Sequence, residues 1–319
     1  MKLVSLILPC YNHEKYISDC LHSLCDQTYE NIEILITDDC SRDGSFEILR
    51  SWQQRLEQRF CRVSIRKNPE NRGVVKTLNS MLEDCQGDFI KVLATDDMLL
   101  PDAIEKMVAC AQREDSDIVF TNVYRFDEAL HYPIAHPETL QKHYDSPPRW
   151  GDDLTGALLA RNFICAPGVL MPRRTVETFG MYDPAYIMED FEYWLRVSLS
   201  GKFSYLDECT ALYRTNHNSL SHFSVDAAHI RRHRVFFEQT LAIFSKYEEY
   251  ANLQQKAVFF NRELSTTIGL GDKALCREIL TAMKQRGLAV SVWNRLRVLL
   301  VETNVYLLLK KCKHLIKRK

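Results

Sequence analysis

The chain has 319 residues, of which 46% are hydrophobic and 26% are charged, an ordinary composition for a soluble globular protein. This length allows one large domain, or one domain with a smaller attachment. The formal net charge of -1 argues against a nucleic-acid-binding surface spread over the molecule, so we expect no nucleic acid partner. Eleven cysteines occur without any Cys-x-x-Cys spacing, which indicates reduced, mostly buried thiols in a cytoplasmic protein.

The charge is unevenly distributed along the chain. Residues 295–319 contain eight basic residues and one acid, Glu302, so this tail carries +7 and residues 1–294 carry -8. No stretch reaches the roughly 18 apolar residues of a membrane span. The apolar run from Leu3 to Leu8 is too short for a secretory leader and predicts a first buried strand.

The first hundred residues alternate between two periodicities. Short apolar runs predict strands over residues 3–8, 32–36, 63–65 and 89–93. Apolar residues at helical spacing predict helices over residues 16–24, 46–56 and 74–82. Strands that alternate with helices indicate an α/β fold whose parallel strands are joined by right-handed crossovers.

The pattern changes after Pro101. We expect Pro101 at a first helical position to open a helix over 102–113, followed by a strand over 117–123. Residues 130–150 contain four prolines and no period, which is typical of a long functional loop or lid. Beyond residue 224 the sequence becomes helical in character.

Two predicted strands end in a pair of acids, Asp38-Asp39 and Asp96-Asp97, and a third acidic pair, Glu189-Asp190, follows downstream. In an open α/β sheet, ligands bind in the crevice outside the carboxyl ends of the strands. The alternative is that each pair only opens a loop, since Asp favours turns and helix caps. Repetition at corresponding places favours a polar ligand site.

The residues after the first strand fit a nucleotide base. We expect Pro9 to end strand pairing and Tyr11 to present a ring face, although Tyr11 could equally be a core aromatic. Stacking on an aromatic ring, together with an acid such as Asp39 that accepts from an imide N–H, is what a pyrimidine requires.

The other acids fit metal binding and proton transfer. Asp97 suits Mn²⁺ or Mg²⁺, which proteins hold by one or two carboxylates together with substrate phosphates. Asp190 is a candidate general base, with a helix N-cap as the alternative. Arg214 and His217 lie close in sequence and are candidates to meet phosphates or the metal.

At these residues the chain resembles the inverting family 2 glycosyltransferases of the GT-A fold, of the bacterial surface-polysaccharide type. The resemblance covers about residues 3–221 and rests on ordered motifs, namely Leu8-Pro9-Cys10-Tyr11-Asn12, Gln27 to Ile34, Asp38 to Ser45, Asn71-Arg72-Gly73, Gly87 to Ile90, Thr95-Asp96-Asp97 and Glu189-Asp190. It implies a mostly parallel central sheet flanked by helices, a nucleotide-binding half over about 1–100 and an acceptor half over about 101–223. A helical C-terminal region with a basic amphipathic tail would follow over 224–319.

The resemblance also implies a role for each candidate. Those expected to bind the nucleotide are Pro9, Tyr11, Asn12, Asp39, Arg72 and Asp96. Asp97 would ligate the metal, with His217 as a weaker second ligand, and Asp190 would deprotonate the acceptor hydroxyl. Glu189 and Arg214 are secondary candidates.

Two departures from the family pattern stand out. Ala94-Thr95-Asp96-Asp97 replaces the frequent Asp-x-Asp-Asp, and Leu78-Asn79 replaces a common Arg-Asn pair, so donor preference is less defined. A Gln-x-x-Arg-Trp motif of processive synthases is absent from the sequence, which favours transfer of one sugar per encounter.

The expected activity is therefore metal-dependent, inverting transfer from a nucleoside-diphosphate sugar, UDP-linked by preference, to a hydroxyl of a glycan or lipid-linked oligosaccharide. The alternatives are a nucleotidyltransferase and a catalytically inactive nucleotide-sugar-binding protein. We expect a cytoplasmic location. The basic tail, with Trp293, Leu296, Leu299 and Leu300 on one stripe, suggests peripheral attachment to an anionic membrane surface at the inner face of the cell membrane. Its alternative is a helix packed on the domain.

Overall fold

The computed structural model describes residues 1–127, 129–215 and 227–302 and divides the chain into two compact units. The sheet unit comprises residues 1–149 and 163–217, and the helical unit comprises residues 150–162 and 218–319. These units are defined by packing and not by activity, so the functional division into 1–223 and 224–319 stays a prediction.

The sheet unit contains all nine strands of the described chain. They are β1 (Val4–Cys10), β2 (Ile32–Asp38), β3 (Arg62–Lys67), β4 (Phe89–Val92), β5 (Met98–Leu99), β6 (Ile118–Asp127), β7 (Gln141–Lys142), β8 (Val169–Pro172) and β9 (Phe203–Thr215). Its helices are α1 (Ile17–Cys25), α2 (Ser45–Arg59), α3 (Val74–Asp84), α4 (Ala103–Glu114), α6 (Arg173–Phe179) and α7 (Glu189–Ser198), with short 3-10 helices η1 (Pro137–Thr139) and η2 (Ala166–Gly168). The predicted alternation of strands and helices is confirmed.

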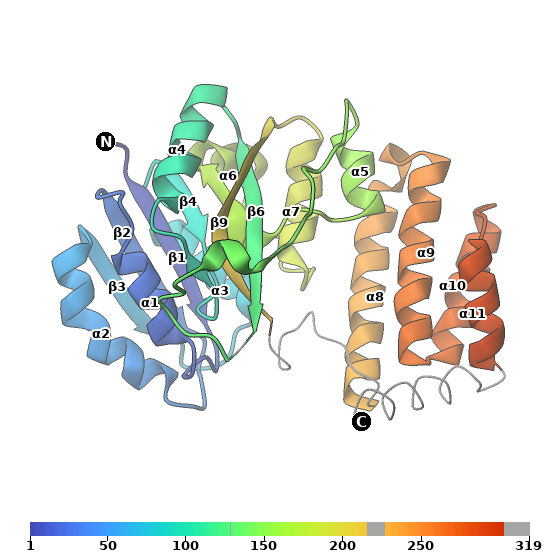
Figure 1. The fold of residues 1–319 in the computed structure, drawn as a ribbon, viewed down its shortest axis with the longest axis horizontal. Coiled ribbons are helices and arrows are strands. Elements are labelled where there is room, and N and C mark those ends of the chain that lie inside the picture. The colour runs from blue at the N-terminus through green and yellow to red at the C-terminus, as the bar shows by residue number, and fades with distance from the viewer. Residues whose placement is uncertain (128, 216–226, 303–319) are drawn as a thin grey trace. The chain divides into compact units, whose positions relative to one another are not determined.

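The strands form one sheet in the order β3-β2-β1-β4-β8-β6-β9-β5, with β7 paired to β6 (Figure 1). The first four strands are parallel, as the crossover pattern predicts. Beyond β4 the sheet is mixed: β8 runs antiparallel to both β4 and β6, whereas β6 and β9 are parallel. The parallel half brings the carboxyl ends of β1, β2 and β4 to one edge.

The core of the sheet unit follows from the period of two along its strands. Leu6 and Leu8 of β1 and Ile34 and Ile36 of β2 are buried in a single apolar cluster with residues of α1, α2 and α4. Figure 1 shows α1 and α2 in front of these strands. Helix α3 contacts β1 and β2 but contributes no residue to that cluster, so it covers the other face.

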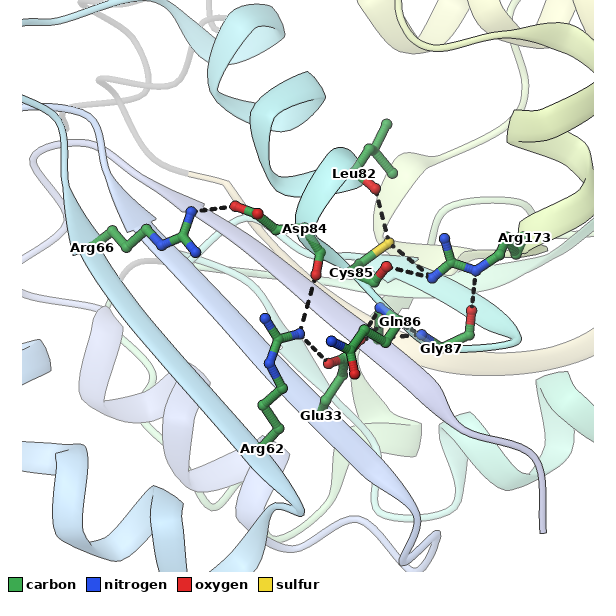
Figure 2. A network of polar contacts seen from close by, with 10 residues as sticks. Glu33, Arg62, Arg66, Leu82, Asp84, Cys85, Gln86, Gly87 and Arg173 are labelled. Atoms are coloured by element: carbon green, nitrogen blue, oxygen red, sulfur yellow. Dashed lines mark hydrogen bonds and ion pairs between the residues drawn. The ribbon is translucent and has the colours of Figure 1, made fainter.

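A polar network closes the amino-terminal edge of the sheet (Figure 2). The fully buried Glu33 of β2 accepts hydrogen bonds from Ser5 of β1, from Arg62 Nη1 of β3 at 2.6 Å and from the N–H groups of Gln86 and Gly87 before β4. Arg173, which follows β8, donates to the carbonyls of Gly87 at 2.8 Å and Cys85 at 2.6 Å. The network therefore joins five neighbouring strands.

Two sequence-based details are wrong at prolines. Helix α4 begins at Ala103 and not at 102, because the Pro101 carbonyl accepts a hydrogen bond from Thr28 N–H at 2.8 Å and stays outside the helix. Pro9 does not end strand pairing, since β1 pairs with β2 through Cys10. Its missing N–H costs nothing there, because pairing of β1 with β4 stops at Ile7.

The stretch predicted to be a long loop is partly ordered. Residues 130–150 contain η1 and the short strand β7, and its remainder is irregular. Tyr132 fastens the start of this stretch to α1, since its N–H donates to Asp19 and its hydroxyl donates to Asp26. The role of the loop as a lid stays a prediction.

The helical unit consists of α5 (Leu154–Ala160), α8 (Ala227–Tyr247), η3 (Glu248–Tyr250), α9 (Leu253–Leu270), α10 (Lys273–Gln285) and α11 (Val292–Glu302). Its core contains the rings of Phe244, Phe259 and Phe260, with 4.1 Å between the first two centroids. The Asn252 side chain caps α9. The predicted helical character beyond residue 224 is confirmed, whereas the membership of α5 in this unit was not predicted.

Candidate active site

The loops after β1 and β2 are locked together at the carboxyl edge of the sheet. Asp39 N–H donates to the Cys10 carbonyl at 2.8 Å, and Asn12 Oδ1 accepts from Arg42 N–H at 2.9 Å. Asn12 has a φ of 57°, a conformation that Asn tolerates better than most residues. Tyr11 beside it is 39% exposed, which excludes the core-aromatic alternative and leaves its ring available for stacking.

The Asp39 carboxylate lies buried in a cradle of donors. Oδ1 accepts from Asn68 Nδ2 at 2.7 Å and from Arg72 N–H at 2.9 Å, and Oδ2 accepts from Gly73 N–H at 2.8 Å. Gly73 adopts a φ of 81°, which favours glycine. A carboxylate offers about four acceptor positions. These contacts fix the orientation of Asp39 and leave one position on Oδ2 for a further donor.

Asp96 and Asp97 form the turn after β4, next to the loop that carries Tyr11. His13 bridges the two segments, since its Nδ1 lies 2.7 Å from Thr95 Oγ1 and its Nε2 lies 3.9 Å from Asp96 Oδ2. Asp97 is buried, and its Oδ1 accepts from Arg214 N–H at 2.9 Å. Burial raises the pKa of Asp97 well above its usual value, and the charge on Asp96 raises it further.

Arg214 supports this turn through protein contacts. Its guanidinium is fully buried, with Nε donating to the Asp96 carbonyl at 2.9 Å and Nη1 donating to the Leu130 carbonyl at 2.8 Å. Nη2 lies 3.1 Å from Asp19 Oδ2. Among the described residues Arg214 therefore donates to protein acceptors, and its proposed contact with a phosphate or the metal stays a prediction. His217, the second candidate of that segment, lies outside the described residues.

Asp190 is the second residue of α7, which begins at Glu189 after the N-cap residue Met188. The alternative that Asp190 is an N-cap is thus excluded. Phe191 and Trp194 lie on the buried apolar face of the helix, while Glu189 and Asp190 are half-buried at its start. Burial raises the pKa of both carboxyls, and the charge on Asp190 raises the pKa of Glu189 further.

The charges of Asp97 and Asp190 both act on the thiol of Cys165. Burial raises the pKa of its thiol, and the negative charges of Asp97 and then Asp190 raise it further. Because such interactions weaken with distance, both acids lie in the surroundings of this one side chain. The buried Lys91 ammonium is also nearby, donating to the Pro167 carbonyl at 2.6 Å. Burial lowers the pKa of Lys91 to about 7, and the charge of Asp97 opposes that shift.

Sequence reasoning missed three residues that organise this edge. They are His13, which bridges two loops, Asn68, which binds Asp39, and Asn79, which exchanges two hydrogen bonds with the backbone of Tyr182. Asn79 lies in α3 and thereby fixes the position of Tyr182, in the segment that precedes Glu189 and Asp190. A polar residue on an otherwise apolar helical stripe was the available signal for Asn79.

The residues at the β4 turn fit a divalent cation. Among the described residues no group of three or more His, Cys, Asp or Glu side chains gathers as a metal site. Mg²⁺ and Mn²⁺ are nevertheless usually held by one or two carboxylates and substrate phosphates. Asp96 and Asp97 supply hard oxygen atoms, and their mutual repulsion, which raises the pKa of Asp97, is what a cation would relieve.

Comparison with known families gives a clear match. The profile of glycosyl transferase family 2 matches residues 5–171. The chain is 30% identical over 223 residues to the putative teichuronic acid biosynthesis glycosyltransferase TuaG of Bacillus subtilis, covering 69% of this chain and 81% of that protein. Two glycosyltransferases of Streptococcus pneumoniae are matched over only 41% and 31% of their own length.

Solved structures share the fold at low sequence identity. Residues 1–349 of TarS from S. aureus in complex with UDP-GlcNAc give a TM-score of 0.56 at 16% identity, covering 85% of this chain and 82% of that one. The mannosyltransferase PcManGT from Pyrobaculum calidifontis in complex with GDP-Man and Mn²⁺ also gives 0.56, at 15% identity, covering 100% and 88%. The expected GT-A fold with additional C-terminal helices is thereby confirmed.

Proposed function

The chain belongs to glycosyl transferase family 2, and from this premise we propose that it moves one sugar from a UDP-sugar to an acceptor hydroxyl with inversion at the anomeric carbon. The acceptor in this proposal is a glycan or lipid-linked oligosaccharide of a surface polysaccharide. The relative TuaG, named for teichuronic acid biosynthesis, supports that acceptor class, and the UDP-GlcNAc complex of TarS supports a UDP-linked donor.

The donor base would stack on the exposed ring of Tyr11 and donate its imide N–H to the free position on Asp39 Oδ2. The exposed Arg72 would lie near the nucleotide, since its own N–H already holds Asp39. Asp96, which His13 orients, would bind the ribose. In this arrangement Pro9 and Asn12 shape the loop that carries Tyr11.

In the transfer step the acceptor oxygen attacks the anomeric carbon on the face opposite the diphosphate. Its proton passes to the Asp190 carboxylate as the new glycosidic bond forms. The bond from the anomeric carbon to the diphosphate oxygen breaks, and UDP leaves with the electron pair. A divalent cation bound by Asp97, with His217 as a second candidate ligand, would neutralise the charge that develops on the diphosphate.

The observation that carries this proposal is the geometry at the carboxyl edge of the sheet, where hydrogen bonds fix Asp39 and His13 ties the Asp96-Asp97 turn to the loop that carries Tyr11. The charges of Asp97 and Asp190 both act on Cys165, which agrees with a common site. A metal-binding acid and a general base have to act on opposite sides of one anomeric carbon, so they need to lie in one site. The raised pKa of Asp190 also suits proton abstraction near neutral pH.

The test is a panel of nucleotide sugars with Mn²⁺ or Mg²⁺ or with EDTA, with binding measured by calorimetry and products by mass spectrometry and NMR. We expect metal-dependent binding of a UDP-sugar, release of UDP, and a product of inverted configuration. An Asp97→Asn variant should lose the metal dependence of donor binding. Release of pyrophosphate would indicate a nucleotidyltransferase, and binding without turnover would indicate an inactive binding protein. Full turnover in EDTA would contradict the metal role.

The place of action in this proposal is the cytoplasmic side of the cell membrane, where a lipid-linked acceptor would be met. Among the described residues, no helix is long and apolar enough to span a bilayer. All ten described cysteines are free thiols, which supports a reducing compartment. Fractionation of cells that express the full chain tests this location.

A further inference from the structure

Helix α11 of the helical unit has two distinct faces. One face packs on α9: Asn294 and Val301 are 4% and 1% exposed, and Asn294 Nδ2 donates to the Asn261 carbonyl at 2.8 Å. Arg297 Nη1 adds a hydrogen bond of 2.8 Å to Ser265 Oγ. The helix is therefore fastened to the unit by specific contacts along its length.

The opposite face is apolar and exposed. Val292, Trp293, Leu296 and Leu299 are 74%, 70%, 53% and 63% exposed, and their spacing places them on one side of the helix. We refer to these four residues as the apolar face of α11. The exposed Arg295 flanks this face. A folded helix that presents four large apolar side chains to solvent marks an interaction surface.

The charge of the adjoining sequence indicates what covers this face. Residues 303–319, which lie outside the described residues, contain six basic side chains and no acid. A second copy of the chain on the same face would bring two such cationic segments together, which is unfavourable. An anionic lipid surface attracts them, and each basic residue near it strengthens binding about fivefold.

We propose that the apolar face of α11 docks on an anionic lipid bilayer, with Trp293 and Leu296 inserted at the headgroup boundary. Trp and Leu on one side of a helix, with basic residues beside them, are the composition of a segment that lies in the membrane interface. The folded contacts to α9 make the helix a preformed platform. This inference goes beyond the proposed transferase activity and does not depend on it.

The test is sedimentation of the full chain with vesicles of phosphatidylcholine that contain about one third phosphatidylglycerol, against phosphatidylcholine alone. We expect binding to the anionic vesicles that falls in high salt. The double variant Trp293→Gln, Leu296→Gln should weaken binding at least about tenfold, because the bilayer no longer buries two apolar side chains. Both side chains are exposed, so its melting temperature should equal that of the parent.

A matched control comes from the same unit. Leu253 and Val258 of α9 are 62% and 46% exposed, and the variant Leu253→Gln, Val258→Gln should bind vesicles as the parent does. A charge variant, Lys310→Gln, Lys311→Gln, Lys313→Gln, should lose affinity for anionic vesicles only.

Four outcomes would overturn the proposal. The parent could fail to bind anionic vesicles, or the α11 variant Trp293→Gln, Leu296→Gln and the α9 control Leu253→Gln, Val258→Gln could lose binding equally. Alternatively, size-exclusion chromatography could show a dimer that Trp293→Gln, Leu296→Gln dissociates, which would assign the apolar face to a second copy. Loss of binding in the lysine variant alone would place docking on the tail and not on α11.

Discussion

The two edges of the sheet use the same residue types for opposite purposes. At the amino-terminal edge, the buried carboxylate of Glu33 receives donors from two neighbouring strands and from the segment before a third. Burial disfavours its charge, but the hydrogen bonds from Ser5, Gln86 and Arg62 prevail and lower its pKa. At the carboxyl-terminal edge, burial prevails and raises the pKa of Asp97 and Asp190.

The difference in pKa shows which buried acids already have their hydrogen-bond donors and counter-charge inside the protein. Glu33 has its counter-charge and donors inside the protein, so the amino edge is complete without a ligand. Within the part of the chain that the structure describes, Asp97 accepts a hydrogen bond from Arg214 N–H and Asp190 accepts one from Phe191 N–H, whereas the Arg214 guanidinium donates to two carbonyls and Asp19. Acids whose ionised form is disfavoured by burial, at the edge of the sheet where ligands bind, are candidates for function.

The largest effect should come from removing the carboxylate of Asp190. Asp190→Asn should lower kcat by about a hundred- to ten-thousand-fold, because amide nitrogen and oxygen cannot accept the acceptor proton. Donor affinity should be unchanged, and the melting temperature should not fall, since a poorly solvated charge is removed. Steady-state kinetics, donor calorimetry and thermal unfolding provide the three measurements.

Glu189→Gln is the matched control for this change, one residue earlier in α7. It should leave kcat within about a factor of ten of the parent if Asp190 alone takes the proton. Retention of more than about a tenth of the parent rate by Asp190→Asn would remove Asp190 from the mechanism.

The opposite behaviour is expected at the amino edge. Glu33→Ala should reduce the free energy of unfolding by about 3 kcal/mol, because the buried N–H groups of Gln86 and Gly87 lose their acceptor and Arg62 loses its counter-charge. The kcat of the folded fraction should stay within about twofold. Urea unfolding, with kinetics at a temperature where the variant is folded, checks both. A stable but inactive Glu33→Ala protein would refute the division between the edges.

The sequence was informative where the signal is local. Acids directly after apolar runs placed Asp39 and Asp97 at one edge, because parallel strands bring their carboxyl ends together. The functional roles of these acids stay predictions. The partners of Asp39, by contrast, include Asn68, which is 29 positions away, so only the folded chain brings them together. Glu33 gave no signal, since one acid in an apolar strand does not reveal donors on two neighbouring strands. The placement of α5 in the helical unit depends likewise on packing between distant segments.

The pH dependence should differ between the two edges. The pKa of Asp190 is raised from 3.8 to about 6, so the rate should rise about tenfold per pH unit below 6 and level off above it. Because the pKa of Asp190 is higher in the folded chain than in the unfolded chain, protonation of Asp190 increases the stability of the fold as the pH falls from about 6 to 3.8. The lowered pKa of Glu33 has the opposite effect on stability. The ionised Glu33 stabilises the fold above pH 4.5, and this stabilisation is lost as the pH falls through the folded pKa.

Kinetic and melting profiles from pH 4 to 8, recorded for the parent, Asp190→Asn and Glu33→Ala, separate the two contributions. Any residual rate of Asp190→Asn should lose the rise near about pH 6, while Glu33→Ala should keep it. A parent rate that is flat between about pH 5 and 7 would contradict the raised pKa of Asp190.

The smallest effect concerns an exposed pair joined to the Glu33 network, since the Asp84 carbonyl accepts a hydrogen bond from Arg62 Nη1 at 3.1 Å. Arg66 of β3 forms an ion pair with Asp84 of α3 (Figure 2), and the two side chains are 52% and 35% exposed. Because water solvates both charges in the unfolded and the folded chain, Arg66→Ala should cost less than about 1 kcal/mol, and salt should reduce that cost further. Unfolding in low and high salt measures it beside Glu33→Ala. If the Arg66 variant lost as much stability as the Glu33 variant, then burial of the carboxylate would not be what makes the amino edge strong. The whole polar network would act as one cooperative unit, in which an exposed member matters as much as the buried one.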